Sequence, residues 1–199
     1  MEINGFQLFP GALDPGDQAA LVQTVLEAAE TAPFYRPIIP SGKAMSVLQT
    51  SFGPLGWITD RAGYRYEPAH PGTGKPWPAM PESLLQIWRR HAPDAPAPDS
   101  CLINLYRGQA KMGLHQDADE ADFSVPVLSI SVGDTAVFRL GGETRGDPTR
   151  TLRLSSGDIC LLTGASRRFF HGVDRILSGS SRLIPGGGRI NLTMRRANV

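Results

Sequence analysis

The most informative segment of this chain is Arg189-Ile190-Asn191-Leu192-Thr193-Met194-Arg195, in which polar and apolar side chains alternate strictly. Successive side chains of a β-strand point to opposite faces of the sheet, so the segment predicts a strand with one polar and one apolar face. Taken alone, an ordinary strand whose polar face meets water is the simpler interpretation. The alternative is a strand that turns its two arginines into the interior of a closed β-structure.

The residues before this segment predict further short strands separated by turns. The chain contains 22 glycines and 17 prolines, which favours turn-rich β-structure over long helices. We expect strands at 101–106, 126–132, 135–140, 150–154, 158–162 and 168–173. Several short strands without intervening helices indicate a closed or double-sheeted β-architecture.

The N-terminal half has a different pattern. A helix is expected to begin at Asp14-Pro15 and to end before Pro33, and a second helix should cover 81–91. The residues between them, 33–78, predict short strands joined by loops. We therefore expect a mainly β protein with flanking helices, in the α+β class, in which residues 1–199 form a single domain.

Composition and charge restrict the classes of protein that fit. A hydrophobic content of 41% with 20% charged residues excludes a disordered or fibrous protein. The net charge of +1 gives no sign of a strongly basic surface for nucleic acid. From Arg139 onward, however, eleven arginines stand against four acidic residues, and some of these arginines are expected to face inward.

The cellular location is predicted from the cysteines and the apolar segments. Cys101 and Cys160 each lie in an apolar run, which is typical of buried reduced thiols. No apolar segment reaches the roughly 18 residues of a membrane span, and the first residues do not resemble a signal peptide. We expect a cytoplasmic protein that does not bind membranes.

A candidate metal site is His115-Gln116-Asp117, because residues two apart in an extended chain point the same way. The tripeptide alone is a weak signal, and a third ligand is needed. His70 lies in a loop and His91 ends a helix, so His171, on an expected strand, is the best candidate. Two histidines and one carboxylate form the facial triad of non-haem Fe(II) oxygenases, although zinc also accepts these ligands.

A polar pocket is expected beside this site. Asn104 and Tyr106 share one face of the 101–106 strand, as Arg189 and Arg195 do in the last strand. Two such strands with their polar faces inward would form a pocket for an anionic small molecule, because the planar guanidinium group binds both oxygens of a carboxylate. The arginines beside the metal favour iron, since zinc hydrolases do not require them.

Several motifs of this chain resemble those of the Fe(II)/2-oxoglutarate-dependent dioxygenases of the AlkB type. The terminal Arg-x-Asn-x-Thr-x-Arg motif is far more specific than His-x-Asp. The resemblance covers about 45–195 and includes Cys101-Leu-Ile-Asn104-Leu-Tyr106, Leu114-His115-Gln116-Asp117-Ala118-Asp119-Glu120, Phe170-His171-Gly172, Leu55-Gly56-Trp57 and Gly63-Tyr64-Arg65-Tyr66.

The resemblance implies a fold and a set of site residues. The fold would be a double-stranded β-helix, or jelly-roll, at 101–199, with a helical and loop-rich nucleotide-recognition part at 1–100. Fe(II) would be bound by His115, Asp117 and His171. The residues that would hold 2-oxoglutarate are Asn104, Tyr106, Arg189 (on the distal carboxylate), Asn191 and Arg195 (near the chelating end). The residues that would shape the nucleotide site are Trp57, Tyr64, Tyr66, Asp119 and Arg145.

The resemblance also implies an activity. With Fe(II), 2-oxoglutarate and O2, a monomeric enzyme would demethylate N-alkylated bases such as 1-methyladenine and 3-methylcytosine, releasing formaldehyde, succinate and CO2. The partner would be methylated DNA, with RNA left open. Asp119, two residues past Asp117 on the same face of an expected strand, would favour the cationic base, whereas Glu120 is expected to be solvated. The alternatives are a 2-oxoglutarate-dependent hydroxylase of a protein or small molecule, and a cupin-type binding module without redox chemistry.

Overall fold

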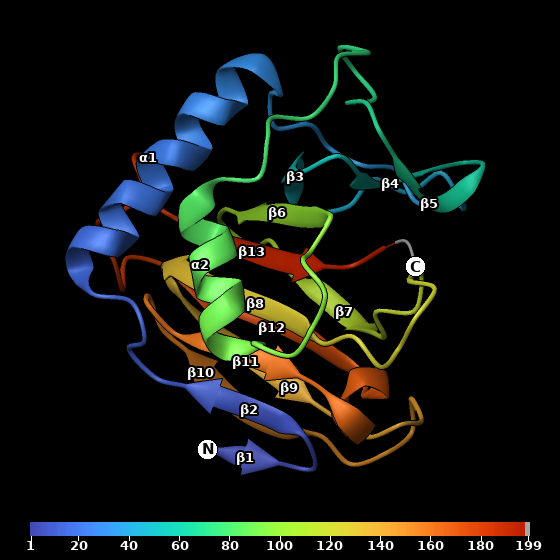
Figure 1. Ribbon diagram of the computed structural model, residues 1–199, viewed down its shortest axis with the longest axis vertical. Helices are drawn as coiled ribbons and strands as arrows, with labels where there is room; N and C mark the ends of the chain where they lie inside the picture. Colours follow the sequence, from blue (N-terminus) through green and yellow to red (C-terminus); the bar gives the residue numbers. More distant parts are fainter. Residues whose placement is uncertain (198–199) are drawn as a thin grey trace.

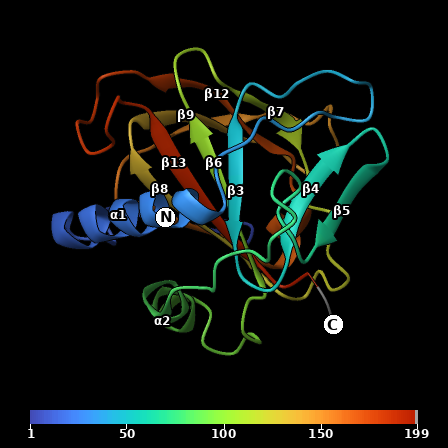
Figure 2. The same ribbon diagram turned by 90° about the horizontal axis from the view of Figure 1, so that it is seen from above.

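The structure, a computed structural model, describes residues 1–197 and contains two facing β-sheets with two helices on one side (Figures 1 and 2). The larger sheet has the order β1 (Glu2–Ile3), β2 (Phe6–Phe9), β11 (Ile159–Leu162), β8 (Val127–Gly133), β13 (Arg189–Arg195), β6 (Ser100–Tyr106) and β3 (Leu48–Phe52). The smaller sheet has the order β10 (Arg150–Leu154), β9 (Thr135–Leu140), β12 (His171–Leu177) and β7 (Met112–His115). The jelly-roll expectation is confirmed.

The helices cover the outer face of the larger sheet. Helix α1 (Pro15–Thr31) begins where expected, with the side chain of Asp14 accepting a hydrogen bond from the backbone N–H of Asp17 at 2.8 Å. Helix α2 (Glu82–His91) places Trp88 in the same apolar cluster as Ile190 and the other apolar residues of β13. Figure 2 shows the larger sheet between the two helices and strands β9, β12 and β7.

The two faces of β13 have different surroundings in this arrangement. Its apolar side chains pack under the helices, and its polar side chains point between the two sheets. Arg189 is only 1% exposed and Arg195 only 6%. The simpler interpretation, a polar face in water, is therefore wrong, and the interpretation with inward-pointing arginines is confirmed.

One expected strand differs from the structure. Residues 168–173 were predicted as a strand, but the chain first forms a 3-10 helix, η1 (Gly164–Arg168), and β12 begins only at His171. Gly164 has a φ of 55°, and Thr163 and Ser166 form a reciprocal capping box around the start of η1. As a result His171 is the first residue of its strand.

A separate hairpin, β4 (Gly56–Asp60) and β5 (Gly63–Glu67), lies beside the larger sheet (Figures 1 and 2). It rests on Trp77, whose indole N–H donates to the carbonyl of Glu67 at 2.9 Å. A Cβ atom on Gly56 would lie 2.4 Å from the Trp77 ring, so only glycine allows this close approach. Trp77 therefore fixes the position of the hairpin.

Strands β1, β2 and β3 of the first hundred residues form the two edges of the larger sheet, so a boundary at residue 100 does not separate two sheets. The single-domain organisation stays a prediction. Cys101 and Cys160 are free and buried, as expected. In the described part of the chain, no helix is long and apolar enough to cross a membrane.

Candidate functional site

His115, Asp117 and His171 come together at one end of the space between the sheets, with all their ligand atoms within 4.8 Å of one another. His171 and His115 are directly opposite each other in the β12–β7 pairing, which explains how residues far apart in sequence meet. Asp117 follows β7 in a loop. Its Oδ1 lies 3.8 Å from His115 Nε2, and its Oδ2 lies 3.6 Å from His171 Nε2.

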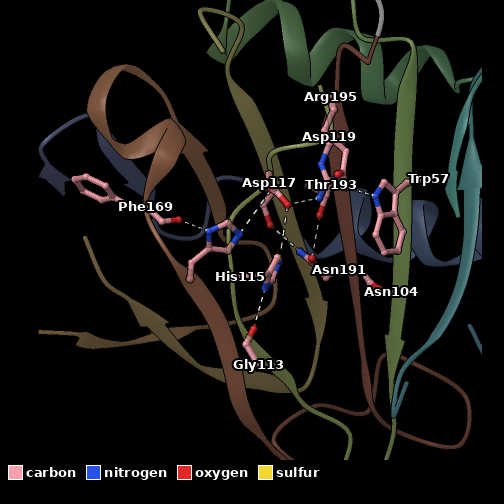
Figure 3. Close-up of polar contacts among 12 residues, drawn as sticks. Trp57, Asn104, Gly113, His115, Asp117, Asp119, Phe169, Asn191, Thr193 and Arg195 are labelled. Atoms are coloured by element: carbon pink, nitrogen blue, oxygen red, sulfur yellow. Dashed lines mark hydrogen bonds and ion pairs between the residues drawn. The ribbon is translucent and has the colours of Figure 1, made fainter. Parts of the chain in front are cut away.

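Both imidazole rings are oriented by backbone carbonyls. His115 Nδ1 lies 2.9 Å from the carbonyl oxygen of Gly113 (Figure 3). His171 Nδ1 lies 2.9 Å from the carbonyl oxygen of Phe169. A carbonyl only accepts hydrogen bonds, so each Nδ1 carries the hydrogen and each Nε2 keeps its lone pair. The two lone pairs and the Asp117 carboxylate therefore face one point, as metal ligands require.

The protonation states favour cation binding. Burial, and to a smaller extent nearby His115, lowers the pKa of His171 to about 4, so the ring is neutral at pH 7. Burial alone would raise the pKa of Asp117, but Arg195, the two histidines and Arg167 hold it well below its usual range. The site thus presents the neutral imidazole of His171 and an ionised carboxylate.

These shifts predict how the metal-free protein responds to acid. Between pH 6.5 and about 4 the unfolded chain takes up a proton at His171 while the folded protein does not, so stability should fall as the pH falls. The expected loss from His171 is on the order of 3 kcal/mol. The folded protein also holds the pKa of Asp117 below its ordinary value of 3.8. The stability that Asp117 contributes is therefore lost only when the pH falls below that value. Urea unfolding at a series of pH values measures both effects.

The matched variant is His171→Asn, which removes the titrating ring. Its free energy of unfolding should depend much less on pH between 6.5 and 4 than that of the unchanged protein. Equal pH dependence in the two proteins would show that His171 is not buried in its neutral form.

Arg189 lies deeper between the sheets and is incompletely paired. Its Nη2 donates to Ser131 Oγ at 2.9 Å, but Nε and Nη1 have no hydrogen-bond partner among the described residues. Burial lowers the pKa of this guanidinium below its usual value. Unpaired buried donors on a cation are costly, so this arginine fits a ligand that brings a carboxylate.

Arg195 lies at the other end of the same strand, beside Asp117. It donates to Asp117 Oδ1 at 2.7 Å and lies 3.5 Å from Glu120 Oε1 (Figure 3 shows the bond to Asp117). It also donates to the hydroxyl of Tyr66 at 3.4 Å, and its Nε has no partner among residues 1–197. Arg189 and Arg195 thus bracket the space next to His115, Asp117 and His171, six residues apart on one strand face.

The other residues expected around 2-oxoglutarate differ in how far their polar groups are already hydrogen-bonded within the protein. Tyr106 is directly opposite Arg189 in the sheet, and burial raises the pKa of its hydroxyl to about 12, so the hydroxyl remains a donor. Asn104 accepts a hydrogen bond from Gln49 at 2.8 Å. Asn191 uses its amide hydrogens on Ser129 Oγ and on the carbonyl of Ile130. A contact between Asn191 and the ligand stays a prediction.

The residues expected around the nucleotide lie on the hairpin and the rim. Trp57 and Tyr64 stack with ring centroids 5.6 Å apart, and Tyr64 is 50% exposed. The indole N–H of Trp57 donates to Asp119 Oδ2 at 2.7 Å (Figure 3). The hydroxyl of Tyr66 turns inward to Glu120 and Arg195. Arg145 is exposed and lies over the ring of Phe170.

Two local expectations were wrong. Asp117 and Asp119 do not share a strand face, because β7 ends at His115 and both lie in the following loop. Glu120 is not solvated: it is 5% exposed and forms an ion pair with Arg167 at 2.6 Å. The sequence does not indicate this pair, because nothing in the local pattern shows which of the adjacent residues Arg167 and Arg168 is buried.

The residues present fit Fe(II) and 2-oxoglutarate, the groups that the resemblance implies. Two imidazole nitrogens and one carboxylate are the donor set of a divalent transition metal with open positions. The unpaired guanidinium nitrogens of Arg189 and Arg195 fit a dicarboxylate between them. Fold and site together define a 2-oxoglutarate-dependent oxygenase.

The comparisons with known proteins agree. The model of the 2OG-Fe(II) oxygenase superfamily matches residues 5–195. The chain is 60% identical over 197 residues to the alpha-ketoglutarate-dependent dioxygenase AlkB homolog of Caulobacter vibrioides, covering 99% of this chain and 90% of that protein. It is 43% identical to AlkB of Escherichia coli, covering 89% and 83% of the two chains. The chain belongs to the AlkB family of Fe(II)/2-oxoglutarate-dependent dioxygenases, whose cofactors are Fe(II), 2-oxoglutarate and O2.

A solved structure supports the fold. That of OsALKBH1 superposes with a TM-score of 0.81 at 29% identity, covering 98% of each chain. Two less similar relatives match 50% and 42% of this chain. They are named a DNA N(6)-methyladenine demethylase in Arabidopsis thaliana and a tRNA demethylase in Schizosaccharomyces pombe.

Proposed function

We propose that this enzyme repairs methylated DNA by oxidative demethylation of N-alkylated bases such as 1-methyladenine and 3-methylcytosine. The observation that carries the proposal is the Trp57–Tyr64 stack bonded to Asp119, two residues from Asp117. An aromatic face next to a carboxylate suits a planar cation, and both of these methylated bases are cationic. The names and activities of the AlkB relatives support the same substrate class.

The roles of the residues follow from their surroundings. His115, Asp117 and His171 would hold Fe(II) through the two Nε2 atoms and the carboxylate. Arg189 and Tyr106 would bind the distal carboxylate of 2-oxoglutarate, and Arg195 would lie near its other end. When bound, Fe(II) with O2 supplies the oxidising power for hydroxylation of an N-methyl carbon.

The overall reaction balances without a further reductant. One 2-oxoglutarate and one O2 give succinate and CO2, and the hydroxylated methyl group leaves the base as formaldehyde. Asp119 would stabilise the cationic base in the site, and Trp57 would hold its plane. A base in a duplex must be flipped out first, which costs least for a lesion that cannot pair.

The proposal includes the cellular location and the oligomeric state of the enzyme. We place the enzyme in the cytoplasm, where the two buried free thiols would stay reduced. We also expect a monomer that does not bind membranes. Whether RNA is a second substrate is decided by the same assay as the DNA activity.

Succinate release with a panel of substrates tests the function. Single-stranded oligonucleotides containing 1-methyladenine or 3-methylcytosine should stimulate it, whereas the unmethylated oligonucleotide should not. Methylated RNA oligonucleotides form a parallel arm. Stimulation only by a peptide or a small molecule would favour the alternative, a hydroxylase with the same cofactors.

Trp57 gives a specific prediction for the substrate site. Replacing it by alanine should weaken binding of a methylated oligonucleotide about 10- to 100-fold, because one aromatic stack on a base is worth about 1–3 kcal/mol. Fluorescence anisotropy with the metal-loaded protein measures the change.

Trp57→Phe is the matched control, because it keeps an aromatic ring but loses the N–H that donates to Asp119. Its affinity should lie between those of the alanine variant and the unchanged protein. Unaltered affinity in Trp57→Ala would place the base elsewhere.

A further inference from the structure

We propose that Arg167 and Glu120 form a buried brace that positions Asp117 for metal binding. This inference rests on the proposed function, because it takes Asp117 and His171 as metal ligands. Neither residue of the brace belongs to the group His115, Asp117 and His171, so both would be positioning residues. The brace would act by fixing the loop that carries Asp117.

The guanidinium of Arg167 holds that loop at three places. Its Nη1 donates to the backbone carbonyl of Asp117 at 2.5 Å, and its Nη2 donates to Glu120 Oε2 at 2.6 Å. Its Nε donates to the carbonyl of Val125 at 3.1 Å. One planar group thus fixes both ends and the middle of the 117–125 loop, which has no regular secondary structure.

The position of Arg167 in the chain gives the brace its significance. The last turn of η1 carries Arg167, and the chain then reaches His171 within four residues. The metal ligands come from two separate segments, one with His115 and Asp117 and one with His171. Arg167 ties the second segment to the carbonyl of Asp117, so it fixes the distance between the ligands of the two segments.

Glu120 completes the brace electrostatically. The cluster around the 117–125 loop contains two buried carboxylates, Asp117 and Glu120, and two buried guanidiniums, Arg167 and Arg195. Without Glu120, two cations would remain beside a site that must accept a divalent cation. Glu120 also accepts a hydrogen bond from the hydroxyl of Tyr66 on the hairpin, which connects the hairpin with the brace.

The brace can be removed without an unpaired charge. A buried ion pair replaced by apolar side chains of similar volume is often neutral for stability, whereas loss of one partner is costly. The double variant Arg167→Met/Glu120→Leu is therefore the main test. Arg167→Lys is the second variant, because its single ammonium keeps a charge beside Glu120 but cannot replace the three-way fork.

The measured quantity is the dissociation constant for Mn(II) alone, by calorimetry, with the thermal midpoint measured in parallel. The double variant should remain folded and bind Mn(II) about 10- to 100-fold more weakly, the range seen when a group supporting a metal ligand is lost. Arg167→Lys should also bind Mn(II) more weakly. The control Arg65→Met, which breaks two partly exposed ion pairs on the hairpin, should keep its Mn(II) affinity.

Each outcome separates the brace from the proposed function. Unchanged Mn(II) affinity in a folded double variant, or in Arg167→Lys if the double variant does not fold, would overturn the brace and leave the function intact. An unchanged protein that binds no Mn(II) would contradict the metal site itself, and with it this inference.

Discussion

Replacing Asp117 by alanine is expected to abolish turnover, with a loss on the order of 10³-fold or more, as for other residues that act directly on the reacting centre. The variant loses the single carboxylate of the His115–Asp117–His171 group. It also leaves the buried Arg195 without its strongest partner, which lies at 2.7 Å. A guanidinium whose only charged partner among residues 1–197 is then Glu120, at 3.5 Å and shared with Arg167, would repel the divalent cation that the site must bind. Succinate release and Mn(II) affinity measure the two parts of the effect.

The matched control for this variant is Asp122→Asn, in the same loop. Asp122 is partly exposed and accepts a hydrogen bond from the backbone of Ser124, so its loss should leave turnover nearly unchanged. Activity retained in Asp117→Ala would remove Asp117 from the metal ligands.

Replacing Arg189 by methionine is expected to raise the KM for 2-oxoglutarate about 10²- to 10³-fold, the cost of losing a buried, charge-paired partner. The same variant should be as stable as the unchanged protein, or more stable, when 2-oxoglutarate is absent. The reason is that two of the three guanidinium nitrogens have no partner among the described residues. Thermal unfolding with and without 2-oxoglutarate tests both expectations, because a bound ligand raises the midpoint.

Arg153→Met serves as the control, since Arg153 is an exposed residue of β10. It should keep both its KM and the stabilisation by 2-oxoglutarate. An unaltered KM in Arg189→Met would contradict the dicarboxylate pocket. A large loss of stability without the ligand would show that Arg189 has a mainly structural role.

Strands with a clear local pattern could be predicted from the sequence. The strands at 135–140, 150–154 and 189–195 have the predicted bounds, because alternation and turn residues are local signals. The inward direction of Arg189 and Arg195 was only one of two interpretations until the helices were seen on the opposite face of β13. Which face of an amphipathic strand points into the site depends on what the rest of the chain packs against the other face.

Features that depend on distant partners could not be predicted. Glu120 is buried because Arg167, 47 residues away, neutralises it. The inward turn of the Tyr66 hydroxyl has the same cause, since Glu120 and Arg195 bind it there. By contrast, η1 had a local signal in Thr163 and Ser166, whose capping box precedes His171.

The charge of the chain also has a structural explanation. Several arginines of the basic C-terminal part, Arg167, Arg189 and Arg195, are buried between the sheets or against the 117–125 loop. They therefore contribute little to an external basic surface. A nearly neutral chain is compatible with an enzyme that binds one flipped base and few phosphates.

The decisive measurement is a mass balance on a single-stranded oligonucleotide that contains one 1-methyladenine. Mass spectrometry follows the loss of the methyl group, while succinate and formaldehyde are quantified in the same reaction. We predict one succinate and one formaldehyde for each methyl group lost, only when Fe(II) and 2-oxoglutarate are present, and none with Asp117→Ala. Succinate formation without any loss of the methyl group, or methyl loss that does not need 2-oxoglutarate, would contradict the proposed function.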